Sequence, residues 1–197
     1  MPALILASQS PRRQELLRRI GVDDFTVLAT DSDESYDPRW SPEELVSRLS
    51  ARKAAAAARA AGPDALVIAA DTMVFLDDRR LGKPADEADA FGMLSALSGR
   101  EHTVRTGVTV RRGDLSRTEV EATAVRFRPL TAEEIRRYIA TGEPMDKAGA
   151  YGIQGLGALL VEGIRGDYFN VMGLPVLRLA RMLRGFGVDL FLGREEA

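Results

Sequence analysis

The chain has 197 residues, of which 45% are hydrophobic and 28% charged, and its 27 basic and 29 acidic residues give a formal net charge of −2. These values are ordinary for a soluble globular protein, and they give no electrostatic support to a nucleic-acid-binding or membrane-surface role. The absence of cysteine excludes disulfides, thiolate metal sites and a thiolate nucleophile. We expect one domain over residues 1–197, with a lobed arrangement. A cytoplasmic location is predicted, because no secretory leader or membrane-length apolar run is found.

The first predicted elements are a buried strand over residues 3–7 and a helix that begins at Ser10-Pro11 and ends at Gly21. Ser10 is expected to cap the helix with its hydroxyl, and Pro11 suits the first helical position. Arg12 and Arg13 stand in the first turn, where the helix dipole makes a cation unfavourable by about 0.3–1 kcal/mol. Two guanidinium groups beside free helix N–H groups indicate a site for a large anion. The alternative is an exposed arginine pair on a surface helix.

The remaining elements alternate between strands and helices, which favours an α/β fold. Capping boxes are expected at Ser41/Glu44 and at Thr131/Glu134. Asp71 stands where a buried apolar strand ends, the place at which reactive groups collect in open α/β sheets. The predicted strands cover 25–28, 65–70 with an extended continuation to 76, 101–111 and 115–128 joined as a hairpin, 158–161 and 168–172. The predicted helices cover 41–61, 85–97, 131–142 and 175–187, and a polar tail follows from residue 193.

Residues 142–157, GEPMDKAGAYGIQGLG, are predicted to form an irregular loop, and its glycines indicate that the backbone comes close to another group. The loop is not a dinucleotide-binding fingerprint, because the strand–turn–helix context and the later acidic residue are missing. The chain also has no GxxxxGK[ST] sequence, which weighs against a P-loop enzyme.

Phosphate-ester chemistry needs dispersed positive charge and a group that orients the attacking oxygen. The chain offers such cations beside the carboxylates Glu34 and Asp71, and an acid at the end of a buried strand needs a partner, a metal or a catalytic task. Cations in an empty site should repel one another, so replacing one should lower the melting temperature little. The alternative for each lysine is a solvated surface position, and His102, the only histidine, is expected to be structural. The candidate cations are Arg12, Arg13, Lys53, Lys83 and Lys147.

Several separate motifs resemble those of the Maf proteins, a family of nucleoside triphosphate pyrophosphatases, and together they cover Leu4 to Leu183. They are SxSPRR after an apolar strand, ADTMV, LGKP, SGREHTVRTGV, DKAGAYGIQG and GDYFNVMGLP. The resemblance implies an elongated mixed sheet flanked by helices, with two lobes around a deep cleft, as in Maf and ITPase-like proteins. It implies hydrolysis of a nucleoside triphosphate between the α and β phosphates with a divalent metal, Mg²⁺ or Mn²⁺.

The resemblance also assigns expected roles to residues. Asp71 matches the general base, and Asp71 with Glu34, which matches an acid of a DxDE motif, would hold the metal. Ser8, Arg12, Arg13, Lys53, Lys83 and Lys147 match polar residues that bind the substrate.

The base preference follows from a branch of the family that takes dTTP and UTP and carries Arg, Thr and Gln at the positions of Arg12, Thr72 and Gln154. A glutamine amide can donate to one group of a uracil or thymine edge and accept from another. A glutamate there would suit a guanine edge, as in the branch that takes 7-methyl-GTP. Four alternatives stay open: a different base preference, a broader house-cleaning hydrolase for modified nucleotides, a non-catalytic regulator of septum formation, and a nucleic-acid-binding module. A homodimer is possible, and no nucleic-acid or membrane partner is expected.

Overall fold

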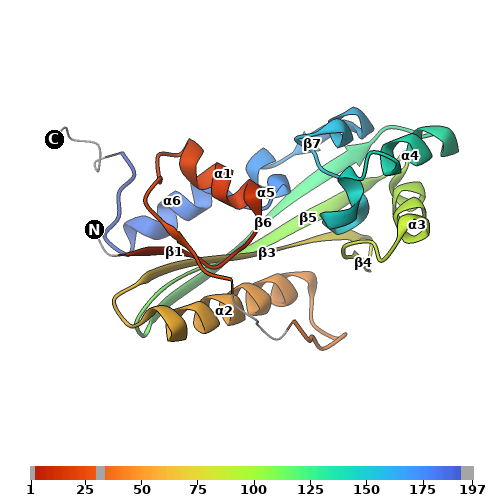
Figure 1. Ribbon diagram of the computed structural model, residues 1–197. Helices are drawn as coiled ribbons and strands as arrows, with labels where there is room; N and C mark the ends of the chain where they lie inside the picture. Colours follow the sequence, from red (N-terminus) through yellow and green to blue (C-terminus); the bar gives the residue numbers. More distant parts are fainter. Residues whose placement is uncertain (1–2, 30–33, 192–197) are drawn as a thin grey trace. The chain divides into compact units, whose positions relative to one another are not determined.

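The structure is a computed structural model, and it describes residues 3–29 and 34–191. The described residues form a seven-stranded mixed sheet flanked by helices, with strand order β2-β1-β3-β5-β6-β7 and β4 paired to β3 (Figure 1). This confirms the predicted α/β class. The strands are β1 (Leu4–Leu6), β2 (Thr26–Val27), β3 (Leu66–Leu76), β4 (Arg79–Leu81), β5 (Glu101–Arg112), β6 (Leu115–Phe127) and β7 (Val161–Arg165). The α-helices are α1 (Pro11–Arg19), α2 (Pro42–Ala61), α3 (Glu87–Leu97), α4 (Ala132–Ile139), α5 (Tyr168–Met172) and α6 (Val176–Arg184). The 3₁₀ helices are η1 (Glu143–Asp146), η2 (Ala148–Ala150) and η3 (Leu156–Leu160).

The chain divides into two compact units. The first unit consists of the chain up to Asp71, Thr106–Glu121 and the chain from Gly173 onward. The second consists of Thr72–Arg105 and Ala122–Met172. No helix in the described part of the chain is long and apolar enough to span a membrane.

In the first unit, β1 pairs in parallel with both β2 and β3, and α2 covers one face of these strands while α1 and α6 lie on the other (Figure 1). The alanines of α2 allow close packing, since Ala54 and Ala57 are fully buried against Val67 and its neighbours. Gly107 of β5 lies so close to α2 that an added Cβ would stand 2.2 Å from the carbonyl oxygen of Val46. The predicted capping box of α2 is confirmed.

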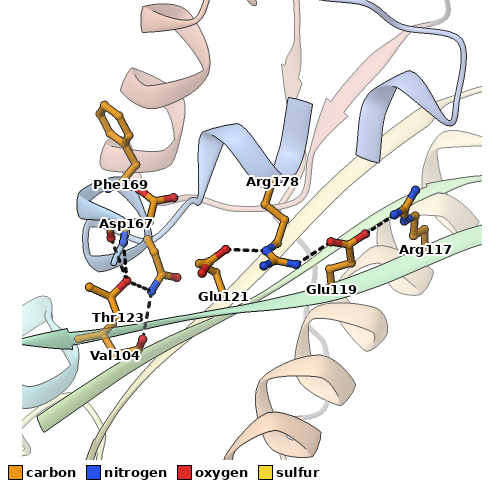
Figure 2. A network of polar contacts seen from close by, with 9 residues as sticks. Val104, Arg117, Glu119, Glu121, Thr123, Asp167, Phe169 and Arg178 are labelled. Atoms are coloured by element: carbon orange, nitrogen blue, oxygen red, sulfur yellow. Dashed lines mark hydrogen bonds and ion pairs between the residues drawn. The ribbon is translucent and has the colours of Figure 1, made fainter. Parts of the chain in front are cut away.

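The C-terminal helix α6 is fastened to β6 within the same unit by ion pairs. Arg178 donates from Nε to Glu121 and from Nη1 to Glu119, each at 2.7 Å, and Glu119 also pairs with Arg117 (Figure 2). Partial burial opposes the charge of Arg178, but the two carboxylates outweigh it and raise the pKa of the guanidinium. The network thus holds the amphipathic helix on the sheet.

In the second unit, β3 pairs with β4 and β6 pairs with β7, both antiparallel. His102, Phe127 and Tyr151 form an edge-to-face aromatic cluster, in which His102 Nε2 lies 2.8 Å from the hydroxyl of Tyr151. Burial lowers the pKa of His102 to about 4, so the imidazole is neutral near pH 7. The expected structural role of His102 fits this position. The capping box of α4, Thr131 with Glu134, is also confirmed.

Two predicted strands of the second unit are wrong. Residues 168–172 form the helix α5, because the carboxylate of Asp167 accepts from the backbone N–H of Phe169 at 2.8 Å and initiates a helical turn. Asn170 then donates to the carbonyl of Val104 and the hydroxyl of Thr123 (Figure 2). Residues 158–161 mostly belong to η3, because Ala158 N–H closes a turn onto Gly155, and the strand β7 begins only at Val161.

Candidate functional site

The predicted site residues fall into two groups, one in each unit, which are described separately. The first group, within the first unit, contains Ser8, Arg12, Arg13, Glu34, Lys53 and Asp71. The second group, within the second unit, contains Thr72, Lys83, Lys147 and Gln154.

Asp71 is the centre of the first group. It does not end its strand, as the sequence predicted, because β3 continues to Leu76. The strand that ends is its parallel neighbour β1, whose last pair joins Leu6 to Ile68. Asp71 therefore lies beyond the carboxyl end of β1 and is still buried. Asp71 thus lies at the carboxyl end of a strand, as a site residue of an open sheet would, but the strand that ends is the neighbouring β1 and not its own.

The ammonium of Lys53, from the middle of α2, lies between two carboxylates. Its Nζ is 2.5 Å from Asp71 Oδ1 and 2.9 Å from Glu34 Oε1. The second oxygen of Asp71, Oδ2, is buried and has no hydrogen-bond partner among the described residues. A buried carboxylate oxygen without a donor is costly, which indicates that it serves a proton, a metal or a ligand.

Arg13 is braced at the start of α1. Its Nε donates to the carbonyl of Gly173 at 2.8 Å, and its Nη1 donates to the hydroxyl of Ser8 at 3.0 Å. Burial lowers the pKa of Arg13. The Asp71 carboxylate acts in the opposite direction and raises the pKa, whereas the neighbouring Arg12 lowers it further. The expectation of unpaired cations is therefore wrong for Arg13 and Lys53, although Arg12 still repels Arg13.

Ser10 precedes α1 as predicted, but its hydroxyl makes no capping hydrogen bond. Its backbone N–H instead donates to the hydroxyl of Ser8 at 3.3 Å, the group that also accepts from Arg13. The turn is therefore organised around Ser8.

The proposed metal ligands, Glu34 and Asp71, belong to the first group. Among residues 3–29 and 34–191, no three histidine or acidic side chains gather as a cage for a metal ion. Mg²⁺, however, is commonly bound by one or two carboxylates together with substrate phosphates and water. The buried Asp71 Oδ2 fits that mode, and Glu34 is largely exposed. Asp31 and Asp33, the other two acids of the DxDE motif, and the predicted tail from residue 193 lie outside the described residues.

In the second group, the loops that carry Lys83 and Lys147 are joined, because Gly149 N–H donates to the carbonyl of Gly82 at 3.0 Å. Lys147 is mostly buried, and its Nζ donates at 2.6 Å both to the carbonyl of Glu143 and to Asp146. Lys83 is exposed and makes no side-chain hydrogen bond to any described residue. Thr72 is partly buried, and Gln154 is exposed.

The sequence analysis missed two side chains that organise the glycine loop, Tyr138 and Glu143. The hydroxyl of Tyr138 donates to Glu143 Oε1 at 2.8 Å, and Glu143 in turn accepts backbone N–H groups of the loop. The sequence contained one indication of these contacts, the high density of glycines in the loop. The glycines indicated that the backbone comes close to another group, but not which residues supply that group.

The mixed sheet and the first group of residues define an α/β protein with a buried, lysine-paired carboxylate and a buried arginine, Arg13, that Ser8 and Gly173 hold. The model of the family "Maf-like protein" matches residues 3–186, and the chain belongs to that family.

Among its relatives are three proteins named dTTP/UTP pyrophosphatase. The relative from Symbiobacterium thermophilum is 54% identical over 98% of both chains. The relative from Moorella thermoacetica is 53% identical over 97% of this chain and 98% of its own. The relative from Bacillus velezensis is 50% identical over 94% of this chain and 97% of its own. A solved dITP/XTP pyrophosphatase from Mycobacterium abscessus aligns over 93% of this chain and 97% of its own with 14% identity and a TM-score of 0.43, too low a similarity to carry an argument.

Proposed function

We propose that the protein hydrolyses dTTP and UTP between the α and β phosphates, releasing the nucleoside monophosphate and pyrophosphate. The observation that carries the proposal is the buried carboxylate of Asp71, with one oxygen held by Lys53 and the other without a donor among the described residues. Relatives of about 50% identity over nearly the whole chain, named dTTP/UTP pyrophosphatase, support the choice of substrate.

Asp71 is proposed as the general base. A water molecule adds to a phosphorus of the α–β anhydride, its proton passes to Asp71 Oδ2, and the bond from that phosphorus to the bridging oxygen breaks. Lys53 fixes the carboxylate through Oδ1, so that Oδ2 is left for the proton. The burial of Asp71 limits competition from bulk water.

Positive charge from Arg12, Arg13 and Lys53 is proposed to bind the phosphates. Ser8 holds the Arg13 guanidinium by a hydrogen bond, so this donor is oriented before substrate arrives. A divalent ion, Mg²⁺ or Mn²⁺, held by Asp71 and Glu34 with the substrate phosphates, would neutralise negative charge on the leaving group. Lys83 and Lys147 stay predictions as phosphate ligands.

Gln154 is proposed to read the base, and Thr72 and Arg12 stay predictions as further substrate-binding residues. An amide presents one donor group and one acceptor oxygen, which match the N–H and carbonyl groups of a uracil or thymine edge. The exposed position of Gln154 leaves its amide accessible to a ligand. House-cleaning of the cytoplasmic nucleotide pool, with modified pyrimidine nucleotides as further substrates, is the role proposed for this activity, and a homodimer stays a prediction.

The test is a panel of nucleoside triphosphates, ordinary and modified, incubated with the purified protein and either Mg²⁺ or Mn²⁺. We expect the highest kcat/KM for pyrophosphate release with dTTP and UTP. A preference for 7-methyl-GTP, or no release from any member of the panel, would contradict the proposal.

A further inference from the structure

The glycine loop of the second unit, residues 152–157, is held by two side chains, Glu143 and Tyr138. Glu143 Oε2 accepts from the backbone N–H of Leu156 at 2.9 Å. Its Oε1 accepts from the N–H of Gly157 at 3.0 Å and from the hydroxyl of Tyr138 at 2.8 Å. The oxygen of that hydroxyl accepts from the N–H of Gly152 at 3.1 Å. Two side chains thus bind three backbone amides of one short loop.

The same two side chains lie close to two glycines of this loop, Gly155 and Gly157. A Cβ atom on Gly155 would stand 2.4 Å from Glu143 Oε2, and one on Gly157 would stand 2.7 Å from the Tyr138 hydroxyl. Real Cβ atoms essentially never approach so closely, so a larger residue would displace the carboxylate or the loop. The close approach at Gly155 is therefore made to Glu143. At Gly157 an added Cβ would also meet the carbonyl oxygen of Gly152 at 2.6 Å, and at Gly152 it would meet the side chain of Lys147.

The protonation states of Glu143 and Tyr138 favour the hydrogen bonds that hold the loop. Partial burial opposes ionisation of Glu143, but hydrogen bonds from Gly157, Tyr138 and Leu156, with the nearby Lys147 ammonium, outweigh it and lower the pKa of the carboxyl. Burial raises the pKa of Tyr138, so the phenol keeps the proton that it donates. The carboxylate accepts charge-assisted hydrogen bonds, which are stronger than neutral ones.

Gln154 lies at the tip of the turn that these contacts hold. Gly155 N–H donates to the carbonyl of Gly152 at 3.2 Å, which closes the turn, and Ile153 is buried beside the exposed Gln154. The side chain of Gln154 makes no hydrogen bond within the described part of the chain. Its position is therefore set by the backbone of the turn, and not by partners of its own amide.

We propose that Glu143 and Tyr138 are positioning residues for base selection: they fix the turn so that the Gln154 amide meets the pyrimidine edge in one orientation. The proposal rests on the proposed function. A loosened turn would still allow Gln154 to contact the base. The free-energy cost of ordering the turn on binding would, however, lower the affinity for the nucleotide. Loss of either positioning residue should therefore raise KM for dTTP and UTP and weaken base preference, with kcat less affected.

The test uses Glu143→Gln and Tyr138→Phe, with Glu133→Gln as the matched control. Glu143→Gln keeps the shape but removes one acceptor oxygen, so the N–H of Leu156 or of Gly157 loses its partner. Tyr138→Phe removes the hydroxyl that joins Gly152 to Glu143 while leaving Glu143 ionised, so it is a second route if Glu143→Gln fails to fold. Glu133 is an exposed carboxylate on the same helix as Tyr138 and pairs only with Arg137 among the described residues.

Two measurements are made on each protein. The first is amide hydrogen exchange, which should become faster over residues 152–157 in both variants and stay unchanged in the control. The second is kcat and KM for dTTP, UTP, CTP and GTP. Because one bidentate base contact is worth about 5- to 150-fold in discrimination, the preference for dTTP and UTP should fall by a factor in that range.

Unchanged preference in both variants would overturn the proposal, and so would an equal loss of kcat for all four nucleotides, which would make the contacts scaffolding only. A wild-type protein that releases pyrophosphate from neither dTTP nor UTP would overturn the proposed function itself. That outcome is distinguishable, because it is seen before any variant is compared.

Discussion

The contact between Lys53 and Asp71 predicts an asymmetry between two substitutions, Lys53→Met and Asp71→Asn. In Lys53→Met the ammonium is lost, so both oxygens of the Asp71 carboxylate are left buried without a partner among the described residues. In Asp71→Asn the ammonium keeps Glu34, 2.9 Å from Nζ, and the amide oxygen of the new asparagine can still accept from it. The lysine variant should therefore be the less stable of the two.

The magnitude follows from burial, since the side chains of Lys53 and Asp71 are 18% and 10% exposed. Removing one partner of a buried ion pair costs about 3–5 kcal/mol, and the residual exposure places this pair near the lower end. For a chain of this size each kcal/mol lowers the melting temperature by about 2–4 °C, so Lys53→Met should melt about 6–12 °C below the wild type. The double variant should recover part of the loss, because it leaves no buried charge.

The assay is thermal unfolding at neutral pH, followed by circular dichroism, of the wild type, both single variants and the double variant. Arg19→Met provides the control, since Arg19 has an exposed ion pair with Glu15. An exposed pair contributes little, so the control should melt with the wild type. A Lys53→Met protein that melts with the control, or a double variant no more stable than Lys53→Met, would refute the reasoning.

Three further predictions concern activity and pH. Asp71→Asn should lower kcat for dTTP by about 10²–10⁴-fold while the protein stays folded, and turnover close to that of the wild type would remove Asp71 from the mechanism. Gln154→Glu should lower kcat/KM for dTTP and UTP more than for CTP, GTP and 7-methyl-GTP by a factor of about 5–150, and a uniform loss would leave Gln154 as scaffolding. Burial lowers the pKa of His102 from 6.5 to about 4, so as the pH falls the unfolded chain protonates this imidazole before the folded protein does. The stability that the neutral imidazole contributes should therefore be fully present above pH 6.5 and should be lost as the pH drops toward 4. His102→Gln should remove this component of the pH dependence of the melting temperature. The same slope of melting temperature against pH in the wild type and the variant would contradict the role of His102 in acid destabilisation.

Local signals predicted the regular elements well. The capping boxes that begin α2 and α4 consist of neighbouring residues, so the sequence contains the whole interaction. Tyr168, Phe169 and Val171 have side chains that favour strands, while the helix α5 depends on the single capping carboxylate of Asp167. Ser10 had the right residue type for a cap, but its hydroxyl makes no capping hydrogen bond.

Parts of the candidate site depend on contacts between residues far apart in the chain. The sequence identified Asp71 and Lys53 separately, but not that one ammonium would join Asp71 to Glu34. It also indicated a close approach in the glycine loop without naming Glu143, because the contact joins residues 13 and 14 positions apart with no repeating pattern. The sequence therefore indicated individual residues, but not the contacts that pair them.

The most direct test of the central claim is the identity of the products from dTTP. The purified protein is incubated with dTTP and Mg²⁺ or Mn²⁺, and the phosphorus-containing products are resolved by ³¹P NMR. The account predicts dTMP and pyrophosphate in equal amounts, with a strongly reduced rate for Asp71→Asn. Formation of dTDP and inorganic phosphate, or no turnover of dTTP by the wild type, would contradict it.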